Sequence, residues 1–388
     1  MRPVSYAPAL STLALPQDKF RLIDVLKIGA VQLIVLHHLA WYGPMSDQVA
    51  LIAPSLIEWL AVYGRIAVQV FLVCGGFLAA RSLHGNTART PWRPIGRRYL
   101  KLVPPFMIAL LLTSAASALA SHWMQHPSIS PAPTVWQFLA HALLLHGVLK
   151  IPALSAGVWY VAIDFQLYAV LAILVWLARR RGAEFFRRSQ QRAGAVSMTA
   201  ATLIAFGCAL SLLFINRLPA WDDWAPYFFG SYGMGALAWW VGRHDSPPRA
   251  GASLWSVMMV VVLVALALDF RSRIAVAAVV ANLLILGFGA RASLATWSPS
   301  VALWIDRASA ASYAVFLIHF PVCLLINALF TRFVAPEPAL QAVGMLLAWC
   351  ASLLAGVLFH RTVEQPCARW LQLRHTPPAM ALQRGLRT

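Results

Sequence analysis

The chain has 388 residues, of which 60% are hydrophobic and only 11% charged, and its mean hydropathy is +0.69. In a soluble domain roughly a quarter of the residues are charged, so this composition excludes a water-soluble globular fold and predicts a membrane protein. The 31 Lys and Arg against 13 Asp and Glu give a net charge of +18, which indicates either nucleic-acid binding or basic cytoplasmic loops.

Ten stretches of the chain are apolar over about the length that a helix needs to cross a bilayer, roughly 17 to 25 residues. We expect them to form the transmembrane helices of an all-α membrane protein. In chain order they are Val25–Tyr42, Tyr63–Ala80, Tyr99–Ala120, Gly157–Ala178, Ser197–Ile215, Tyr227–Gly242, Ala252–Asp269, Ile274–Ala290, Ala311–Phe330 and Pro338–His360.

An eleventh apolar stretch, Val135–Leu149, is short and contains His141 and His146. The two most basic loops, Arg81–Lys101 and Arg179–Arg192, should both face the cytoplasm, so an even number of crossings must separate them. Two of the predicted spans already supply that number. Residues 135–149 are therefore predicted to form a re-entrant or interfacial helix on the outer face.

Both termini are then cytoplasmic, in what we expect to be a bacterial cytoplasmic (inner) membrane, with no removable signal peptide. The predicted divisions are a cytoplasmic segment 1–24, a transmembrane domain 25–360 and a basic cytoplasmic tail 361–388. Six basic residues lie outside: Arg65, Lys150, Arg217, Arg271, Arg273 and Arg332. The remaining 25 lie inside, so orientation explains the positive charge and no nucleic-acid partner is needed.

The five cysteines lack metal-binding spacing, so no metal is expected.

Ionisable side chains inside predicted spans are candidate functional groups, because each costs a few kcal/mol unless it faces a cavity or a partner. His37 and His38 lie near the outer end of the first span, and adjacent helix positions point about 100° apart, so they cannot share one role. Asp164 is expected at a depth close to that of His38, where it could orient the imidazole or pair with an arginine. His319, before Pro321, is equally consistent with a structural and a functional role.

Arg97, Arg98 and Lys101 form a basic cluster at the cytoplasmic mouth of the third span. Such a cluster can bind phosphate groups through charge-assisted hydrogen bonds. It can equally anchor the helix to anionic lipid headgroups, as basic residues at membrane surfaces commonly do. Charge alone does not distinguish the two roles.

Six blocks of this sequence, in this order, resemble the motifs of the acyltransferase 3 family of integral-membrane acyltransferases. In the first, Arg21, Asp24 and Lys27 precede an apolar run to His37–His38, and the spacing from Asp24 matches the family's essential histidine to His38. The others are Gly64 with Val70–Leu78, Arg98 with Lys101 and Pro104, Trp159–Tyr168, Ser312–Tyr313 with His319 and Pro321, and Val363–Pro366. The chain departs from the family where Cys74–Gly75–Gly76 replaces Leu-Ser-Gly and Asp164 replaces the commoner Glu.

The resemblance implies transfer of an acyl group, most often acetyl, from cytoplasmic acyl-CoA to a hydroxyl of a glycan or related acceptor at the outer face. Acyl transfer to an alcohol needs a general base, and imidazole has a suitable pKa. We therefore expect His38 to be the base and Asp164 to orient it. Arg98, Lys101 and Arg97 are expected to bind the CoA phosphates.

Supporting or acceptor-binding roles are expected for eight further residues: His37, Asp24, Arg21, Arg65, Trp159, Gln166, Tyr168 and His319. Because donor groups lie inside and His38 lies in the outer half, a channel must connect them, and Gly75 and Gly76 could open it or simply allow close helix packing. The alternative function is a transporter or flippase for a lipid-linked glycan, since buried His and Asp also suit proton-coupled carriers. Besides membrane lipid and the acceptor, the sequence indicates no partner.

Overall fold

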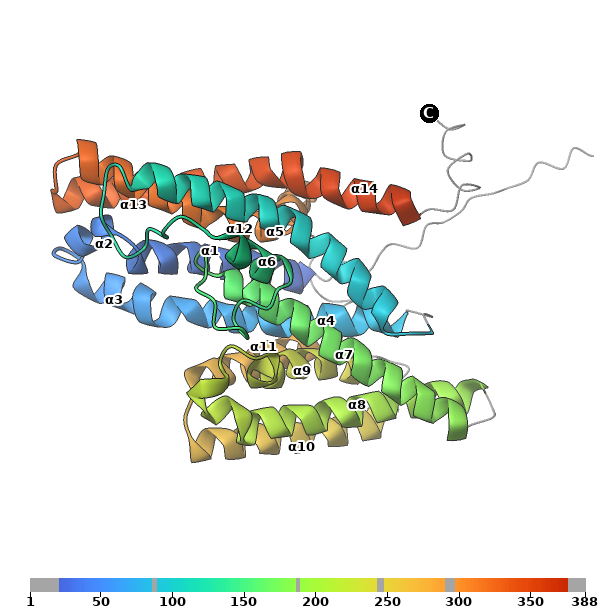
Figure 1. Cartoon of the computed structure of the whole chain (residues 1–388). Helices are drawn as coiled ribbons and strands as arrows, with labels where there is room; N and C mark the ends of the chain where they lie inside the picture. The colour runs from blue at the N-terminus through green and yellow to red at the C-terminus, as the bar shows by residue number, and fades with distance from the viewer. Residues whose placement is uncertain (1–20, 86–88, 186–188, 243–247, 290–296, 376–388) are drawn as a thin grey trace, which may run out of the picture.

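A computed structural model describes residues 21–85, 89–185, 189–242, 248–289 and 297–375. Within these ranges every regular element is helical, which confirms the all-α prediction (Figure 1). The α-helices are α1 (Arg21–Trp41), α2 (Pro44–Val49), α3 (Pro54–Tyr63), α4 (Ala67–His84), α5 (Trp92–Ala120), α6 (Val135–Ala142), α7 (Val158–Phe185), α8 (Ser189–Leu213), α9 (Ala225–Val241), α10 (Pro248–Leu268), α11 (Ser272–Gly289), α12 (Pro299–Phe333), α13 (Pro338–Phe359) and α14 (Gln365–His375).

Eight helical segments in the described ranges are long and apolar enough to cross a membrane, which identifies an integral membrane protein. Two of them join neighbouring helices: Pro54–His84 runs through α3 and α4, and Pro338–Leu373 runs through α13 and α14. The eight segments coincide with eight of the ten predicted spans. The sequence pattern is thus confirmed for these eight.

The other two predicted spans, Tyr227–Gly242 and Ile274–Ala290, correspond to α9 and α11, which are shorter. α9 has 17 residues, and 14 of them are buried among neighbouring helices. The apolar part of α11 is Ser272–Gly287. A helix enclosed by protein needs no lipid-facing surface, so length and hydropathy do not decide whether it spans. The count of ten and the cytoplasmic position of both termini remain predictions.

Glycines allow α9 to pack directly on α4. A Cβ at Gly76 would lie 1.8 Å from the carbonyl oxygen of Tyr232, and one at Gly235 would lie 1.9 Å from that of Val73. Any larger residue at either position would force the two backbones apart. Of the two roles considered for these glycines, Gly76 has close packing, whereas Gly75 borders a cavity, where an added Cβ would lie 3.2 Å from an oxygen of Asp164.

The segment between α5 and α7 folds back onto the bundle instead of crossing it. Its helix α6 has 8 residues and begins with a capping box, in which Thr134 accepts from the Gln137 N–H and the Gln137 side chain accepts from the Thr134 N–H. Turns follow through residue 150, and α6 lies over the middle of the bundle (Figure 1). Residues 135–149 thus contain a helix too short to span a membrane, and its predicted re-entrant or interfacial position on the outer face remains a prediction.

Two helices extend beyond their predicted limits. α12 begins at Pro299, after Ser298 caps it, so it starts 12 residues before the predicted span at Ala311. The first part of the predicted tail 361–388 is also helical, and α14 packs against α5. Residues 1–20 and 376–388, which belong to the predicted N-terminal segment and tail, lie outside the described ranges.

Candidate active site

The centre of the site is a histidine pair formed by α1 and α12. His38 Nδ1 lies 2.6 Å from His319 Nε2, and the two rings are almost parallel, 4° apart, with centroids 4.9 Å apart. Both side chains are buried, with His38 7% and His319 0% exposed. The partner of His38 is therefore a second imidazole, contributed from the far end of the chain.

The hydrogen bonds of His319 determine which nitrogen of His38 is free. His319 Nδ1 lies 3.1 Å from the carbonyl oxygen of Val315, which can only accept, so Nδ1 carries the proton. In the neutral ring Nε2 is then an acceptor, and it receives the hydrogen bond from His38 Nδ1. His38 Nε2 is left with its lone pair available, which is the form that a general base requires.

His37 has a different task. Its Nδ1 donates to the Leu60 carbonyl oxygen at 3.0 Å, which ties α1 to α3. The chain at Gly64 passes so close that a Cβ there would lie 2.7 Å from the Cβ of His37. The structure thus gives adjacent histidines separate partners, as the 100° angle between them requires.

The histidine pair opens onto a cavity of about 420 Å³, called here the histidine cavity. Its lining includes His37, His38, Trp41, Tyr42, Arg65, Val68, Gly157, Trp159, Tyr160 and Phe316. Gly157 has φ of 77°, a conformation that favours glycine, and a Cβ there would lie 3.6 Å from Cε1 of His38. The predicted residues Arg65 and Trp159 are therefore brought to the same cavity as His38.

A second cavity, of about 450 Å³, carries the basic residues and is called here the basic cavity. Lys27, Arg98 and Lys101 line it together with Asp164, Ser309, Tyr313, His360 and Glu364. The Lys27 ammonium donates to the carbonyl oxygen and the hydroxyl of Ser309 at 3.2 and 3.1 Å, and that hydroxyl donates to Asp24. Asp24 thus holds the α1–α12 contact beside this cavity.

Asp164 does not orient His38, contrary to the prediction. Arg98 donates to its carboxylate at 2.6 Å, and Asp164 lines the basic cavity and not the histidine cavity. Only 7% of the Asp164 side chain is exposed, so its charge needs this nearby cation. The arginine pairing that the sequence left open is the one that the structure contains. It also occupies Arg98, whose guanidinium lies 5.5 Å from the ring centre of Tyr168.

Two aromatic side chains separate the cavities. Tyr160 and Phe316 line both of them, and their ring centroids lie 5.3 Å apart. Phe71, which lines the basic cavity, packs edge-on against Phe316 at 6.1 Å and lies 5.9 Å from Tyr160. Tyr160, Phe316 and Phe71 are called here the aromatic wall; the first two line both cavities, and Phe71 packs against them from the basic cavity. The basic cavity and the histidine cavity thus adjoin each other at this wall.

The remaining predicted residues lie apart from the histidine pair. Arg97 is exposed, and neither Arg97 nor Arg21 lines the basic cavity. Gln166 donates to the Leu144 carbonyl oxygen at 2.9 Å, which ties α7 to the turn after α6. In the described part of the chain, no three His, Cys, Asp or Glu side chains are grouped to hold a metal ion. That no metal is required stays a prediction.

Comparison with known proteins tests the resemblance drawn from the motifs. The family model of the acyltransferase 3 family, described as an acyltransferase domain, matches residues 20–360. The chain belongs to the acyltransferase 3 family. The match extends from the residue before α1 to the end of α13, so it includes the histidine pair and the aromatic wall. Membership of the acyltransferase 3 family supports membrane acyl transfer as the activity.

A more distant relative adds little about the reaction. Regulator of hypoxia-inducible factor 1 from Caenorhabditis elegans is 26% identical over 178 residues, which are 42% of this chain and 35% of that protein. The chain therefore matches about a third of the length of this curated relative. No solved structure matches the chain significantly.

Several residues of the acyltransferase 3 site were not foreseen as functional. Tyr160 and Phe316 lie inside apolar runs, where hydropathy gives no reason to single them out. Tyr313, Glu364 and Gln365 belong to the closing motifs, to which the sequence assigned no role, and they line the basic cavity. Their place in the closing motifs was the one signal in the sequence that could have identified them. Their position beside Lys27 and Arg98 is visible only in the packed bundle, because these residues are far apart in the chain.

Proposed function

We propose that this protein transfers an acyl group, acetyl first among them, from acyl-CoA to a hydroxyl of a glycan or related acceptor outside the cytoplasm. The observation that carries the proposal is the histidine pair, because its hydrogen bonds leave His38 Nε2 free to remove a proton. Membership of the acyltransferase 3 family supports the reaction class. In this proposal His38 is the general base, and His319 positions it.

The basic cavity is the proposed donor site. Lys27, Arg98 and Lys101 together with the apolar residues Phe71, Leu78 and Leu102 offer both positive charge and an apolar surface. Acyl-CoA has the matching parts: anionic phosphates and a long, weakly polar pantetheine arm. Because Arg98 already pairs with Asp164 and Lys27 already donates to Ser309, we assign the phosphate contacts to Lys101 before Lys27 and Arg98.

The reaction takes place where the thioester passes the aromatic wall. His38 Nε2 removes the proton of the acceptor hydroxyl, and the hydroxyl oxygen forms an ester bond with the acyl carbon as the C–S bond breaks. The proton on His38 then passes to the departing thiolate to give free CoA. The wall residues Tyr160 and Phe316 must let the acyl end through, since they stand between the two cavities.

The test is turnover of labelled acetyl-CoA by purified protein in detergent, comparing His38→Gln with the control His37→Gln. We expect slow acetyl-CoA hydrolysis by the wild type and a loss of roughly 10²–10⁴-fold in His38→Gln, the usual contribution of a general base. His37→Gln should retain most of the turnover, because His37 bonds a backbone carbonyl. Equal turnover in wild type and His38→Gln would refute the proposed base.

A further inference from the structure

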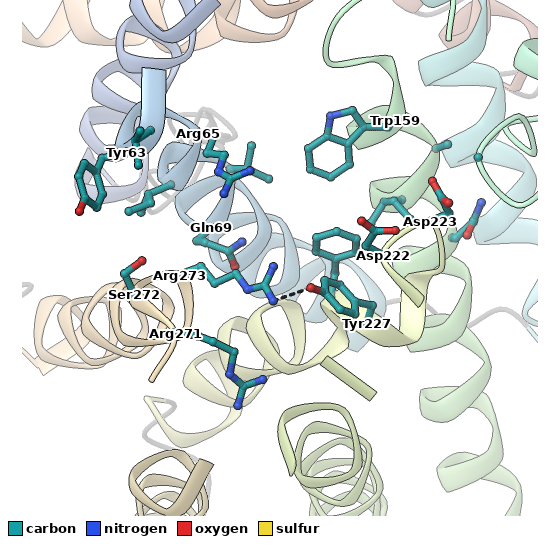
Figure 2. Close-up of a pocket in the computed structure, with 18 of the residues that line it drawn as sticks. Tyr63, Arg65, Gln69, Trp159, Asp222, Asp223, Tyr227, Arg271, Ser272 and Arg273 are labelled. Atoms are coloured by element: carbon teal, nitrogen blue, oxygen red, sulfur yellow. Dashed lines mark hydrogen bonds between the residues drawn. The ribbon is translucent and has the colours of Figure 1, made fainter. Parts of the chain in front are cut away.

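The largest of the cavities described here, about 680 Å³, lies beside the histidine cavity and has no role in the transfer as described so far. Figure 2 shows it between α4, α7, α9 and the start of α11, and we call it the lateral cavity. It shares Arg65, Val68 and Trp159 with the histidine cavity. These three residues form the boundary between the two cavities, so a molecule held in the lateral cavity lies beside the histidine cavity and would have to pass them to reach His38.

One buried side chain in the lateral cavity has no partner. His146 lines it, is only 1% exposed, and neither of its ring nitrogens makes a hydrogen bond in the described part of the chain. An unsatisfied buried polar group costs about 1–3 kcal/mol, so such a group is uncommon unless it serves a ligand. Burial lowers the pKa of His146 to about 4, so the ring is neutral at pH 7 and offers one donor and one acceptor.

The neighbouring histidine shows the contrast. His141 stacks on His146 with centroids 4.0 Å apart, but both nitrogens of His141 are engaged. Its Nδ1 donates to the Gln137 carbonyl oxygen at 2.7 Å, and its Nε2 accepts from the Leu154 N–H at 3.3 Å. His141 is therefore a structural support that fixes the position of the unpartnered ring.

The other groups of the lateral cavity are of mixed polarity. The side chains of Asp222 and Arg65 line it without a hydrogen bond or ion pair in the described residues, and Trp159 is 37% exposed, with its ring tilted 30° against that of Phe228. Arg271 and Arg273 also lie here, but Arg271 donates to Asn216 at 2.6 Å and Arg273 donates to Tyr227 (Figure 2). Hydrogen bonds within the protein thus already engage Arg271 and Arg273.

This combination indicates the class of ligand. A phosphate-rich molecule would need several cations free of internal partners, and a lipid tail would need a uniformly apolar lining. A neutral imidazole, a carboxylate and a guanidinium instead suit many hydroxyls, which both donate and accept hydrogen bonds. The partly exposed indole of Trp159 suits contact with the apolar face of a sugar ring.

We propose that the lateral cavity binds the saccharide acceptor, with His146 and Asp222 bonding ring hydroxyls and Trp159 contacting a ring face. The saccharide then extends past Arg65 so that its reacting hydroxyl reaches His38. This inference rests on the proposed acyl transfer, and it adds the site that selects the acceptor. The donor does not enter the lateral cavity, so acetyl-CoA hydrolysis does not depend on it.

The experiment offers purified variants labelled acetyl-CoA with and without envelope glycans isolated from a host strain that lacks the enzyme. Asp222→Asn changes an exposed residue, and His146→Phe keeps the stacked ring while removing both nitrogens. We expect each to raise the KM for the glycan about tenfold, the effect of losing one hydrogen bond to a substrate hydroxyl. The rate of acetyl-CoA hydrolysis in each variant should stay within about twofold of the wild-type rate.

Asp47→Asn is the matched control. Asp47 is an exposed carboxylate on α2 that lines neither the lateral nor the histidine cavity, so its replacement should alter neither the KM for the glycan nor the rate of hydrolysis.

Two results would overturn the inference while leaving acyl transfer intact. One is an unchanged KM for the glycan in both variants although the wild type transfers acetyl to it. The other is an equal loss of acetyl-CoA hydrolysis in Asp222→Asn, which would place the residue in donor handling. A wild type that neither hydrolyses acetyl-CoA nor acetylates glycan would instead overturn the proposed function on which the inference rests.

Discussion

At the scale of single residues, the reactivity of His38 depends on two hydrogen bonds in series. The Val315 carbonyl oxygen sets the proton of His319, and His319 in turn sets that of His38. Neither hydrogen bond involves His38 Nε2, the nitrogen that would meet the acceptor hydroxyl in the proposed reaction. In the proposed reaction His319 is therefore a positioning residue, whose loss should misdirect the base without removing it.

Replacement of His319 tests this chain of hydrogen bonds. His319→Phe removes the acceptor for His38 Nδ1 and should lower acetyl transfer at least about tenfold, by leaving the tautomer of His38 undefined. His319→Gln, whose side-chain oxygen can accept the same bond, should recover part of the rate. The measurement is the initial rate at saturating acetyl-CoA, with the KM for acetyl-CoA unchanged. No rescue by glutamine would contradict a positioning role.

The buried ion pair of Arg98 and Asp164 gives a second residue-scale prediction. Arg98→Gln strands the Asp164 carboxylate, which is 7% exposed, and should destabilise the protein by about 3–5 kcal/mol. Asp164→Asn strands the Arg98 side chain, which is 30% exposed, and should cost less. The double variant should recover part of this loss. Thermal unfolding in detergent measures it. Additive losses in the double variant would show that the two side chains are not coupled.

At the scale of helices, α4 lines both the lateral and the basic cavities, and its close contact with α9 fixes its position. Gly235 lies so near Val73 that a methyl group would overlap its carbonyl oxygen. Gly235→Ala should therefore destabilise the protein by about 1–3 kcal/mol through overpacking. Gly29 of α1, with no atom within 4 Å of an added Cβ, is the matched control.

Both variants are compared by the midpoint of thermal unfolding in the same detergent. Gly29→Ala should leave the midpoint unchanged or raise it, because alanine is the better helix former. Gly235→Ala should lower it by several degrees. Equal midpoints would mean that α4 and α9 can separate without cost, and would remove the explanation given for these glycines.

Hydropathy located the helices well, but it located their starts and the side-chain directions poorly. The predicted span began at Ala311, whereas α12 begins at Pro299. The early turns of α12 carry Asp306 and Arg307, whose charges lower the hydropathy of that stretch and so concealed the helix.

The depth of Asp164 was predicted to match that of His38. Depth along a helix does not specify rotation about its axis, and rotation turns Asp164 toward Arg98. Contacts between chain ends, such as His38 with His319, require the packed bundle.

At the scale of the whole molecule, the aromatic wall stands between the basic cavity, which is the proposed donor site, and the histidine cavity. Phe71 lies on the donor side only, so it shapes the room for the acyl chain without contacting the histidine cavity. Phe71→Ala should enlarge that room. We expect the rate with butyryl-CoA relative to acetyl-CoA to rise about tenfold, since a methylene group is worth roughly 1–3 kcal/mol in a fitted apolar site.

Leu78→Ala is the control for this prediction, because Leu78 lines the basic cavity but does not stack with the wall. It should leave the ratio of the two rates unchanged. The measurement is the ratio of kcat/KM values for butyryl-CoA and acetyl-CoA in purified protein. The same ratio in Phe71→Ala as in the wild type would show that the wall does not select the acyl chain.

The central claim is that an acyl group crosses from the basic cavity to His38, and sealed inverted membrane vesicles test it most directly. Labelled acetyl-CoA is added outside such vesicles, where the cytoplasmic face is exposed, and acetyl esters on enclosed glycans are measured. With the wild type the label should accumulate inside the vesicles, and with His38→Gln it should fall roughly 10²–10⁴-fold. Equal labelling by His38→Gln, or label that stays on glycans at the donor face, would contradict the account.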